Sequence, residues 1–291
     1  MRISIIMPPF LGDCIMTIPL INQLMRNYKV FIICNDYTYN SLPFLFKYLQ
    51  VLKTSSRQNE IDAIIDLLGD SKSVEFVKQS NAKVTIGFPD ANYNYTYSLP
   101  LPHTYNHEQA TAIYLASLNF LNVPQPDTLN FDFSYKWKYN NQDLILIAPG
   151  AGNLERCFSI NSFNEFAKIL SKTKKVSFIL GPSEQHLAKF IENQHNIITT
   201  NSIESTLDYI SKAKLLIASE SGFMHLAAAY GIPLIGLFKI ASPLNWFPYS
   251  NYLQVAVGNG KNNYTNLKCN VEFPINELIA KTIAIYENIK N

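Results

Sequence analysis

The sequence predicts an α/β protein made of two doubly wound domains in tandem. The chain has 291 residues, which is more than one domain usually holds, so two separate cores are expected. Short apolar runs bounded by turn residues alternate with helical patterns, which is typical of parallel sheets covered by helices on both faces. A polar stretch at 122–142, with prolines at 124 and 126, separates the two series.

Residues 1–140 form the first predicted domain, on the N-terminal side. Its strands are expected at the apolar runs 3–7, 30–34, 63–68 and 84–88. Its helices are expected at 14–27, 72–80 and 107–121. Pro19 lies inside the first of these helices and should kink it or delay its start, because proline lacks the backbone N–H.

Residues 141–274 form the second predicted domain. Its strands are expected at 144–150, 176–181, 196–200, 215–219 and 233–238. Its helices are expected at 161–172, 183–193, 203–212 and 222–230. Residues 275–291 are expected to close the chain as a helix, for which packing back on the N-terminal domain is one predicted arrangement.

Composition excludes several classes of protein. The formal net charge is only +2, from 24 basic and 22 acidic residues, so nucleic acid is not an expected partner. Four scattered cysteines indicate reduced thiols and a cytoplasmic protein. No uninterrupted apolar run reaches the ~18 residues that a membrane-spanning helix needs. Two prolines near the start interrupt the core that a signal peptide would require.

Gly12 and Asp13 follow the first strand, at the predicted turn into a helix. Ligands of open parallel sheets bind at the carboxyl ends of the strands, so a carboxylate here can face a ligand. The alternative is that Asp13 is an N-cap, because aspartate often accepts hydrogen bonds from the first-turn N–H groups. The residues alone leave both interpretations open.

The second domain begins with a similar turn, "APGAGNLERCF". Small residues at Gly150, Ala151 and Gly152 allow a ligand to approach the backbone, and the cation of Arg156 follows. Glu184 comes soon after the next strand, in "ILGPSEQ". It either complements the dipole of the following helix or holds ribose hydroxyls of a ligand.

The segment "SESGFMHLAAAYGIPLIGLF", at 219–238, concentrates polar groups ahead of an alanine-rich helix. A helix start presents unpaired N–H groups and partial positive charge, which favours a phosphate. Ser221 and Gly222 allow close approach, and His225 can add a donor. The alternative makes Ser219 an N-cap, Glu220 a partner of the helix dipole and His225 a core residue.

Other motifs argue against common enzyme classes. His103 and His107 are four residues apart, but no third ligand accompanies them, so we expect no zinc site and no bound metal. The sequence contains no G-x-S-x-G elbow, no Walker loop and no G-x-G-x-x-G fingerprint. Their absence argues against a hydrolase, a nucleotide triphosphatase and a dehydrogenase.

Taken together, the blocks resemble glycosyltransferase family 9, the heptosyltransferases of the lipopolysaccharide inner core. "GDCIMTIPLINQL" resembles the family's opening Gly-Asp turn and helix, and "IDAIIDLLG" its following strand. "APGAGNLERCFSINSFNEFAKIL", "ILGPSE" and "SESGFMHLAAAYGIPLIGLF" are similar to three further blocks, in the family's order. The last matches the family pattern "nDSGpmHlAaAlgxPvvalFG" closely.

The resemblance implies a GT-B fold, which is two Rossmann-like domains with a cleft between them. It implies an inverting transfer of a sugar from an ADP-sugar to a lipid-linked saccharide acceptor, with heptose as the leading candidate for the sugar. The transfer would need no metal and no cofactor. Gly12 would lie on the acceptor side and Asp13 would be the general base. The donor would be held by Gly150, Ala151, Gly152, Arg156, Glu184, Glu220, Ser221, Gly222, Phe223, Met224 and His225.

A lipid-linked acceptor also implies peripheral contact with the cytoplasmic face of the inner membrane, with "KWK" at 136–138 as one candidate for the contact. Three features depart from the family pattern. Arg156 replaces its lysine, Glu220 replaces its aspartate, and "LFKIASP" lacks the glycine after the phenylalanine. Two alternatives therefore remain: a catalytically silent GT-B protein that binds a nucleotide or a partner, and a transferase that uses another nucleotide-sugar.

Overall fold

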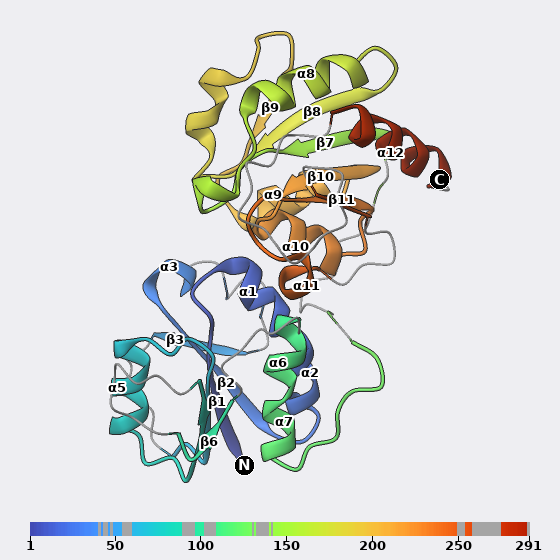
Figure 1. The fold of residues 1–291 in the computed structure, drawn as a ribbon. Helices are drawn as coiled ribbons and strands as arrows, with labels where there is room; N and C mark the ends of the chain where they lie inside the picture. Colours follow the sequence, from blue (N-terminus) through green and yellow to red (C-terminus); the bar gives the residue numbers. More distant parts are fainter. Residues whose placement is uncertain are drawn as a thin grey trace. The chain divides into compact units, whose positions relative to one another are not determined.

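The computed structural model of the chain describes residues 1–39, 42, 46, 49–53, 60–88, 97–101, 109–129, 131, 140, 142–248, 254–257 and 275–289. Contacts divide the chain into two compact units, Met1–Lys136 and Trp137–Asn291. This boundary lies inside the polar stretch that the sequence indicated as a linker. Each unit contains one six-stranded sheet and its covering helices (Figure 1).

The N-terminal unit is built on a parallel sheet in the order β3-β2-β1-β4-β5-β6. Its strands are β1 (Arg2–Ile6), β2 (Lys29–Cys34), β3 (Gln50–Lys53), β4 (Ala63–Asp66), β5 (Val84–Gly87) and β6 (Leu99–Pro100). Its helices are α1 (Leu11–Met16), α2 (Ile18–Met25), α3 (Asp36–Tyr39), α5 (Ser71–Gln79), α6 (Ala110–Leu115) and α7 (Ser117–Phe120). Figure 1 shows α2 and α6 on one face of this sheet and α5 on the other.

The C-terminal unit repeats this topology, in the order β12-β11-β10-β7-β8-β9 with all strands parallel. Its strands are β7 (Leu144–Ala148), β8 (Lys175–Leu180), β9 (Asn196–Thr199), β10 (Leu215–Ser219), β11 (Leu234–Phe238) and β12 (Gln254–Val257). Its α-helices are α8 (Ile160–Leu170), α9 (Ile203–Ile210), α10 (Gly222–Ala229), α11 (Pro243–Trp246) and α12 (Ile275–Asn288). The described part of this unit also contains two short 3-10 helices, η2 (Leu154–Arg156) and η3 (Gln185–Phe190).

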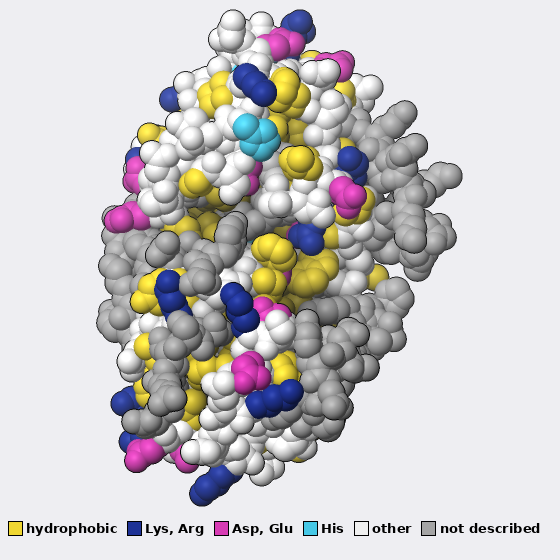
Figure 2. Space-filling model, turned by 90° about the vertical axis from the view of Figure 1, so that its left-hand side faces the viewer, with side chains coloured by type: hydrophobic (Ala, Val, Ile, Leu, Met, Phe, Trp, Pro, Cys, Tyr) yellow, Lys and Arg dark blue, Asp and Glu magenta, His cyan; other side chains and the backbone are white. Residues whose placement is uncertain are grey.

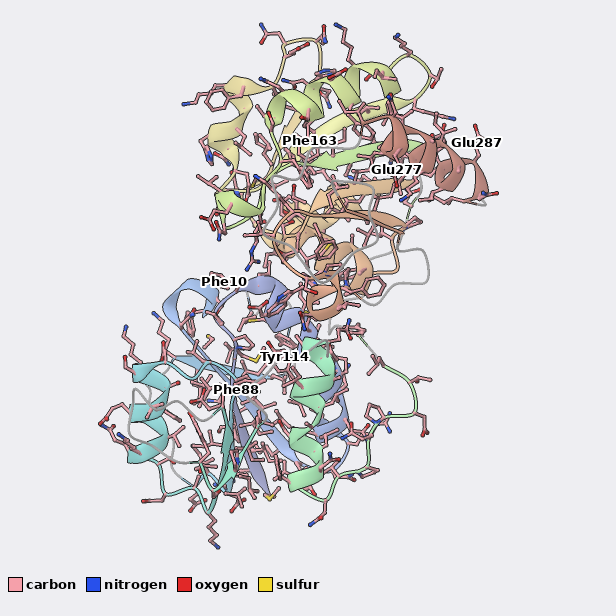
Figure 3. The ribbon with its side chains drawn as sticks, viewed as in Figure 1. Phe10, Phe88, Tyr114, Phe163, Glu277 and Glu287 are labelled. Carbon is pink, nitrogen blue, oxygen red and sulfur yellow. The ribbon has the colours of Figure 1, made fainter. Side chains whose placement is uncertain are left out.

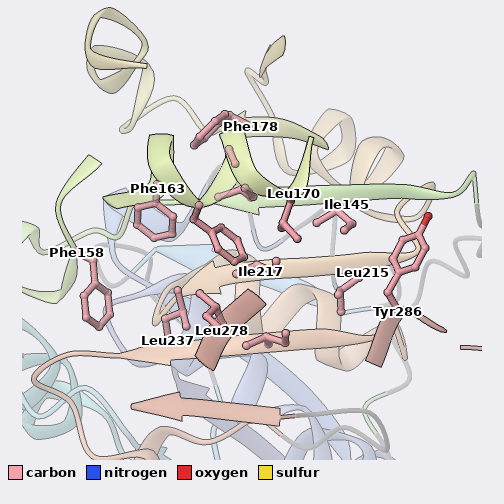
Figure 4. Close-up of a cluster of buried hydrophobic side chains, with 14 of the residues drawn as sticks. Ile145, Phe158, Phe163, Leu170, Phe178, Leu215, Ile217, Leu237, Leu278 and Tyr286 are labelled. Atoms are coloured by element: carbon pink, nitrogen blue, oxygen red, sulfur yellow. The ribbon is translucent and has the colours of Figure 1, made fainter. Parts of the chain in front are cut away.

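Buried apolar strands explain why both sheets are covered on two faces. Every residue of β7, β10 and β11 is buried, as expected for central strands of a parallel sheet. α8 buries Phe163, Phe166, Ala167 and Leu170, a spacing that places them on one face of a helix. Figure 4 shows this α8-side core, in which phenylalanines and isoleucines of α8 and the sheet interlock.

The opposite face of the second sheet carries the α10-side core. Met224 and Ala227 of α10 pack there against Ala218 and Phe238 at the ends of two strands. The small side chains of α10 let it lie close to the sheet. Trp246 of α11 packs against the same core.

The closing helix α12 belongs to the C-terminal unit. It packs on α8, and Leu278, Tyr286 and Ile289 join the α8-side core. The Tyr286 hydroxyl donates to the carbonyl of Asp143 at 3.1 Å. These core contacts of the helix lie in its own unit, and its packing on the N-terminal domain stays a prediction.

Two predicted helices differ from the structure. The stretch 14–27 is two helices, because α1 ends at Met16 and α2 begins at Ile18, where Pro19 occupies a first-turn position. Proline thus delays the helix start as predicted. The helix predicted at 183–193 is the 3-10 helix η3, which has no fully buried residue and so lacks the apolar face that would stabilise an α-helix.

Candidate functional site

The strand order reverses between β1 and β4 in the N-terminal unit, and Asp13 lies at that place. In doubly wound sheets the loops on either side of the reversal diverge, and ligands bind at the carboxyl edge there. β1 ends at Ile6, and the chain reaches α1 at Leu11. Asp13 is half-buried in the first turn of this helix, with Gly12 buried beside it.

The N-cap interpretation of Asp13 is wrong. Phe10 occupies the cap position of α1, in an extended backbone conformation and with no side-chain capping bond. Phe10, labelled in Figure 3, is 55% exposed just ahead of Gly12 and Asp13. The pKa of the neighbouring Cys14 thiol is well above its usual value. Burial is the main cause, and the negative charge of the Asp13 carboxylate is the second.

Asp66, at the end of β4, is the second carboxylate near this reversal. Both of its oxygens accept hydrogen bonds from other groups of the protein. One carboxylate oxygen accepts hydrogen bonds from the N–H groups of Leu68 and Gly69, each at 3.0 Å. The other accepts from the Tyr97 hydroxyl at 2.6 Å. Burial raises the pKa of Asp66, and these hydrogen bonds oppose the rise. The residue holds the loop after β4 in place and is not offered to a ligand.

In the C-terminal unit the order reverses between β7 and β10, and an ion pair joins the loops that follow these two strands. Nη1 of Arg156 lies 3.1 Å from Oε1 and 2.9 Å from Oε2 of Glu220. The Glu220 side chain is 4% exposed and the Arg156 side chain 34% exposed. The guanidinium therefore offers part of its surface to solvent while it compensates a buried carboxylate.

The residues before α10 are placed by the end of β10. Ser219 ends the strand, and its hydroxyl donates to the carbonyl of Pro149 at 2.9 Å, across to the end of β7. It is therefore not the N-cap of α10, and Glu220 does not lie in the helix. Ser221 holds the cap position in an extended conformation, and α10 begins at Gly222.

The Ser221 hydroxyl does not cap the helix that it precedes. It makes no side-chain bond to the first turn of α10. Its Oγ is buried and has no hydrogen-bond partner within the part of the chain that the structure describes. A buried hydroxyl without a partner is costly, by about 1–3 kcal/mol. The cost is removed when a ligand oxygen supplies the partner, so this atom indicates a binding place at the start of α10.

His225 lies one turn into α10 and is buried. Burial, with a smaller contribution from the charge of Arg156, lowers its pKa to about 4. The imidazole is therefore neutral at neutral pH and offers one N–H donor and one acceptor nitrogen. Phe223 and Met224 precede it in the first turn, and only Phe223 is partly exposed.

Glu184 lies across the ends of β7 and β8, at the N-cap position of η3. A Cβ at Gly150 would overlap its Cγ, and a Cβ at Gly181 would come within 2.6 Å of its Oε2. Both glycines therefore make room for this side chain, and a third glycine, Gly152, has open space around it. Burial raises the pKa of Glu184. The side chain leans over the sheet edge and does not simply complement a helix dipole.

The family comparison decides the class of the protein. The family model for glycosyltransferase family 9 (heptosyltransferase) matches residues 50–274, which is most of the chain. The chain belongs to glycosyltransferase family 9. The part that the model matches includes the Arg156–Glu220 pair and α10.

A curated relative agrees with this assignment. The lipopolysaccharide core heptosyltransferase OpsX of Haemophilus influenzae is 30% identical over 115 residues. Those residues are 37% of this family 9 chain and 33% of the relative. The match thus spans about a third of the length of that relative.

Solved structures show the fold. Escherichia coli heptosyltransferase WaaC with ADP has a TM-score of 0.76 and 16% identity, over 98% of this chain and 100% of that one. A family 9 glycosyltransferase of Veillonella parvula has a TM-score of 0.79 and 16% identity, over 98% and 97%. E. coli ADP-heptose lps heptosyltransferase II has a TM-score of 0.79 and 15% identity, over 99% of each chain. The predicted α/β fold of the GT-B class is confirmed.

Two departures from the family pattern meet in one contact. Arg156 stands in place of the family's lysine and Glu220 in place of its aspartate, and the two side chains bind each other. Both contacts come from one guanidinium nitrogen, Nη1, so the two replacements keep opposite charges in contact through an ion pair at a single nitrogen and not through a two-nitrogen fork. The two replacements therefore form a matched pair.

Sequence reasoning gave no role to one residue that the structure brings to this edge. Lys239 directly follows β11, and its Nζ donates to the carbonyl of Cys157 at 2.9 Å. The only signal in the sequence was that the glycine expected after Phe238 is missing. The contact joins residues 82 positions apart, so no local pattern reveals it.

Some predicted features lie outside the described residues: His103, His107 and the "KWK" segment at 136–138. Where side chains are described, no group of three or more His, Cys, Asp or Glu could hold a metal ion. Within the same described part, no helix has the length and apolar character needed to cross a membrane. On the face shown in Figure 2, the described Lys and Arg side chains lie scattered among acidic and apolar ones.

Proposed function

We propose that this chain is an inverting glycosyltransferase that moves a sugar from an ADP-sugar to a lipopolysaccharide inner-core or related glycan acceptor. Heptose is the leading candidate for that sugar. The observation that carries the proposal is the buried, unpartnered Ser221 hydroxyl at the start of α10. In a family 9 chain, a hydroxyl at this helix start can donate a hydrogen bond to an anion, and so it can help to bind a diphosphate. Solved structures of the heptosyltransferase WaaC, one described with ADP and one with ADP-2-deoxy-2-fluoro heptose, support the choice of nucleotide.

The donor side of the proposal uses the edge between β7 and β10. The N–H groups at the start of α10 point along the helix axis toward the place where a diphosphate would bind. Ser221 and the neutral His225 supply further hydrogen bonds, and Arg156 supplies positive charge. Gly152 leaves open space at the loop after β7. Glu220 and Glu184 are the carboxylates that can accept hydrogen bonds from sugar or ribose hydroxyls.

The chemistry is a single displacement with inversion at the anomeric carbon. Asp13 removes the proton from the acceptor hydroxyl as its oxygen forms the new glycosidic bond. The bond from the anomeric carbon to the diphosphate breaks on the opposite face, and its electron pair leaves with the nucleoside diphosphate. Arg156 and the N-terminus of α10 stabilise the charge that develops on the leaving oxygen. The scheme assigns that task to protein groups and asks for no metal or cofactor.

Nucleotide preference is the first test. Thermal shifts with ADP, UDP and GDP report binding directly, because a ligand that binds only the folded state raises its stability. We expect ADP to give the largest shift. A larger shift with UDP would replace the ADP-sugar donor with another nucleotide-sugar, which is the alternative that the sequence left open.

Turnover is the second test, with Asp13→Asn as the variant and Asp127→Asn as the control. Asp127 is exposed and lies in the same unit, so its change matches the charge removed without touching α1. Loss of the general base should lower the rate of ADP-heptose turnover by about 10²- to 10⁴-fold. ADP binding should be unchanged in both variants. An Asp13→Asn protein with normal turnover would remove Asp13 from the proposed role.

The Arg156–Glu220 contact also supports a second candidate, a catalytically silent GT-B protein that binds a nucleotide. Glu220 holds the cation that the proposed reaction needs at the leaving group. If the pair does not open, a nucleotide binds but transfer does not follow. ADP binding without turnover on a panel of donor sugars and acceptors would favour this candidate over the enzyme.

The acceptor in the proposal is lipid-linked, so we also propose peripheral contact with the cytoplasmic face of the inner membrane. The exposed Phe10 beside Asp13 supports this, since an aromatic ring can pack against a sugar or sit at a lipid surface. Flotation with anionic vesicles, comparing the chain with Phe10→Ala, measures the contact. Equal and negligible binding by both proteins would exclude it.

A further inference from the structure

Lys239 is the starting point, because it brings a second cation to the carboxyl edge of the second sheet. It is the first residue after β11, and it is half-buried. Its Nζ donates to the carbonyl of Cys157, the residue that follows Arg156. β10 lies between β11 and β7 in the sheet, so Lys239 joins a strand edge to a loop that starts two strands away.

The charges of this edge converge on the segment 156–157. Arg156 binds Glu220. Glu184 and Lys239 both act on the Cys157 thiol: burial raises its pKa most, the Glu184 charge raises it further, and the Lys239 charge lowers it. Two oppositely charged groups must therefore lie close to the same sulfur. Arg156, Glu184, Glu220 and Lys239 come from the segments that follow β7, β8, β10 and β11 in turn.

The balance of these charges shows why a second cation matters. Glu220 compensates Arg156, Glu184 adds a further carboxyl group, and His225 is neutral because its pKa is about 4. Without Lys239 these groups would have one more carboxylate than cations, and Lys239 balances the two signs. Among the described residues Lys239 forms no ion pair, and the bond to Cys157 uses one of the three N–H donors of its ammonium.

We propose that Lys239 binds the donor diphosphate together with Arg156 and so supplies the positive charge that Glu220 takes from the arginine. The inference rests on the proposed function, since it assumes a nucleoside diphosphate at the start of α10. Lys239 thereby takes over the role of the phosphate-binding cation at a position where the family pattern has a glycine.

The test measures the affinity of the full chain for ADP and for adenosine by titration calorimetry. Lys239→Met removes both the charge and the bond to Cys157, whereas Lys239→Gln removes the charge and keeps an N–H donor. Lys189→Met is the control, because Lys189 is an exposed lysine of η3 that lies over the Phe190 ring. We expect both Lys239 variants to bind ADP roughly ten- to a hundredfold more weakly, as loss of a charge-assisted contact predicts. Adenosine affinity and the control should not change.

A double-mutant cycle with Arg156→Met separates direct binding from positioning. If Lys239 contacts the diphosphate, Lys239→Met weakens ADP binding in the Arg156→Met background as well. If the loss vanishes there, Lys239 acts only through the arginine and the inference is overturned. Equal ADP affinity of the original chain and both Lys239 variants overturns it too. An original chain that binds no ADP instead refutes the proposed function on which the inference rests.

Discussion

At the scale of single residues, the Arg156–Glu220 pair decides how the C-terminal site is charged. A carboxylate that is 4% exposed is tolerated because a guanidinium lies within 3.1 Å of both its oxygens. Removing one partner of such a pair leaves a charge without compensation, which costs more than removing both. The pair therefore stabilises the folded chain and, in the proposed reaction, exchanges partners when the donor binds.

Arg156→Met should lower the free energy of unfolding by about 1–3 kcal/mol, less than for a fully buried pair because the arginine is partly exposed. The double variant Arg156→Met with Glu220→Gln should recover most of the loss, since the neutral amide needs no cation. Denaturant unfolding of the three proteins measures this. If the single and double variants are equally stable, the carboxylate does not depend on the arginine.

His225 makes stability depend on pH. Its pKa is about 4 in the folded chain and about 6.5 when unfolded, so the unfolded state binds more protons as pH falls below 6.5. Stability from the neutral imidazole is complete above pH 6.5 and is lost toward pH 4. Between pH 7 and pH 5 the chain should lose about 2 kcal/mol that a His225→Gln variant does not lose. If the free energy of unfolding falls with pH equally in the two proteins, His225 is not the group that titrates.

At the scale of elements, two helix starts look alike in sequence and differ in structure. Asp70 caps α5: its carboxylate accepts a hydrogen bond from the Ser73 N–H at 2.7 Å. Ser221 holds the same position on α10 and makes no such bond. The first cap stabilises its own helix, whereas the second leaves the first turn of α10 available to a ligand.

The two caps therefore predict opposite outcomes for the same kind of substitution. Asp70→Ala should cost about 1 kcal/mol of stability and leave ADP affinity unchanged. Ser221→Ala should cost no stability, because it removes a buried hydroxyl without a partner, and should weaken ADP binding. Chemical unfolding and ADP titration of both variants check this. A destabilised Ser221→Ala protein with normal ADP affinity would make Ser221 an ordinary cap.

The sequence predicted elements well where apolar runs are long and poorly where they are short. β7, β10 and β11 were expected because all of their residues are apolar or small and buried. β3, with the sequence QVLK, and β6, with only two residues, carry no such signal. They lie at the sheet edges, where neighbouring strands and not local pattern determine pairing.

The candidate site divides in the same way. Motifs indicated Arg156, Glu220 and Ser221 because they lie in contiguous blocks. Their mutual contacts were not predictable, since Arg156 and Glu220 are 64 residues apart. The use of Gly150 as room for Glu184 was not predictable either, because a glycine in a turn reads as backbone freedom and not as space for a distant side chain.

At the scale of the whole molecule, two units with separate cores should respond separately to damage. Leu278 of α12 and Leu118 of α7 are both fully buried, one in each unit. Replacing either by alanine should cost about 2–5 kcal/mol in its own unit. Unfolding of a protein with two such units need not be a single two-state transition.

Calorimetric scans of Leu278→Ala and Leu118→Ala, with and without ADP, test this separation. Leu278→Ala should lower the transition that ADP raises, because the proposed nucleotide site belongs to the C-terminal unit. Leu118→Ala should lower the other transition and leave the response to ADP unchanged. One shared transition that both variants shift equally would mean that the units unfold as one.

The position of α11 gives the protein an intrinsic fluorescent probe of nucleotide binding. Of two tryptophans in the chain, Trp246 packs against the α10-side core, seven residues after Lys239. Indole emission changes in colour and intensity with the polarity around the ring, so a nucleotide that alters the start of α10 should alter the light that Trp246 emits. A Trp137→Phe protein would carry that signal alone, and binding could then be followed in real time without a label on protein or ligand.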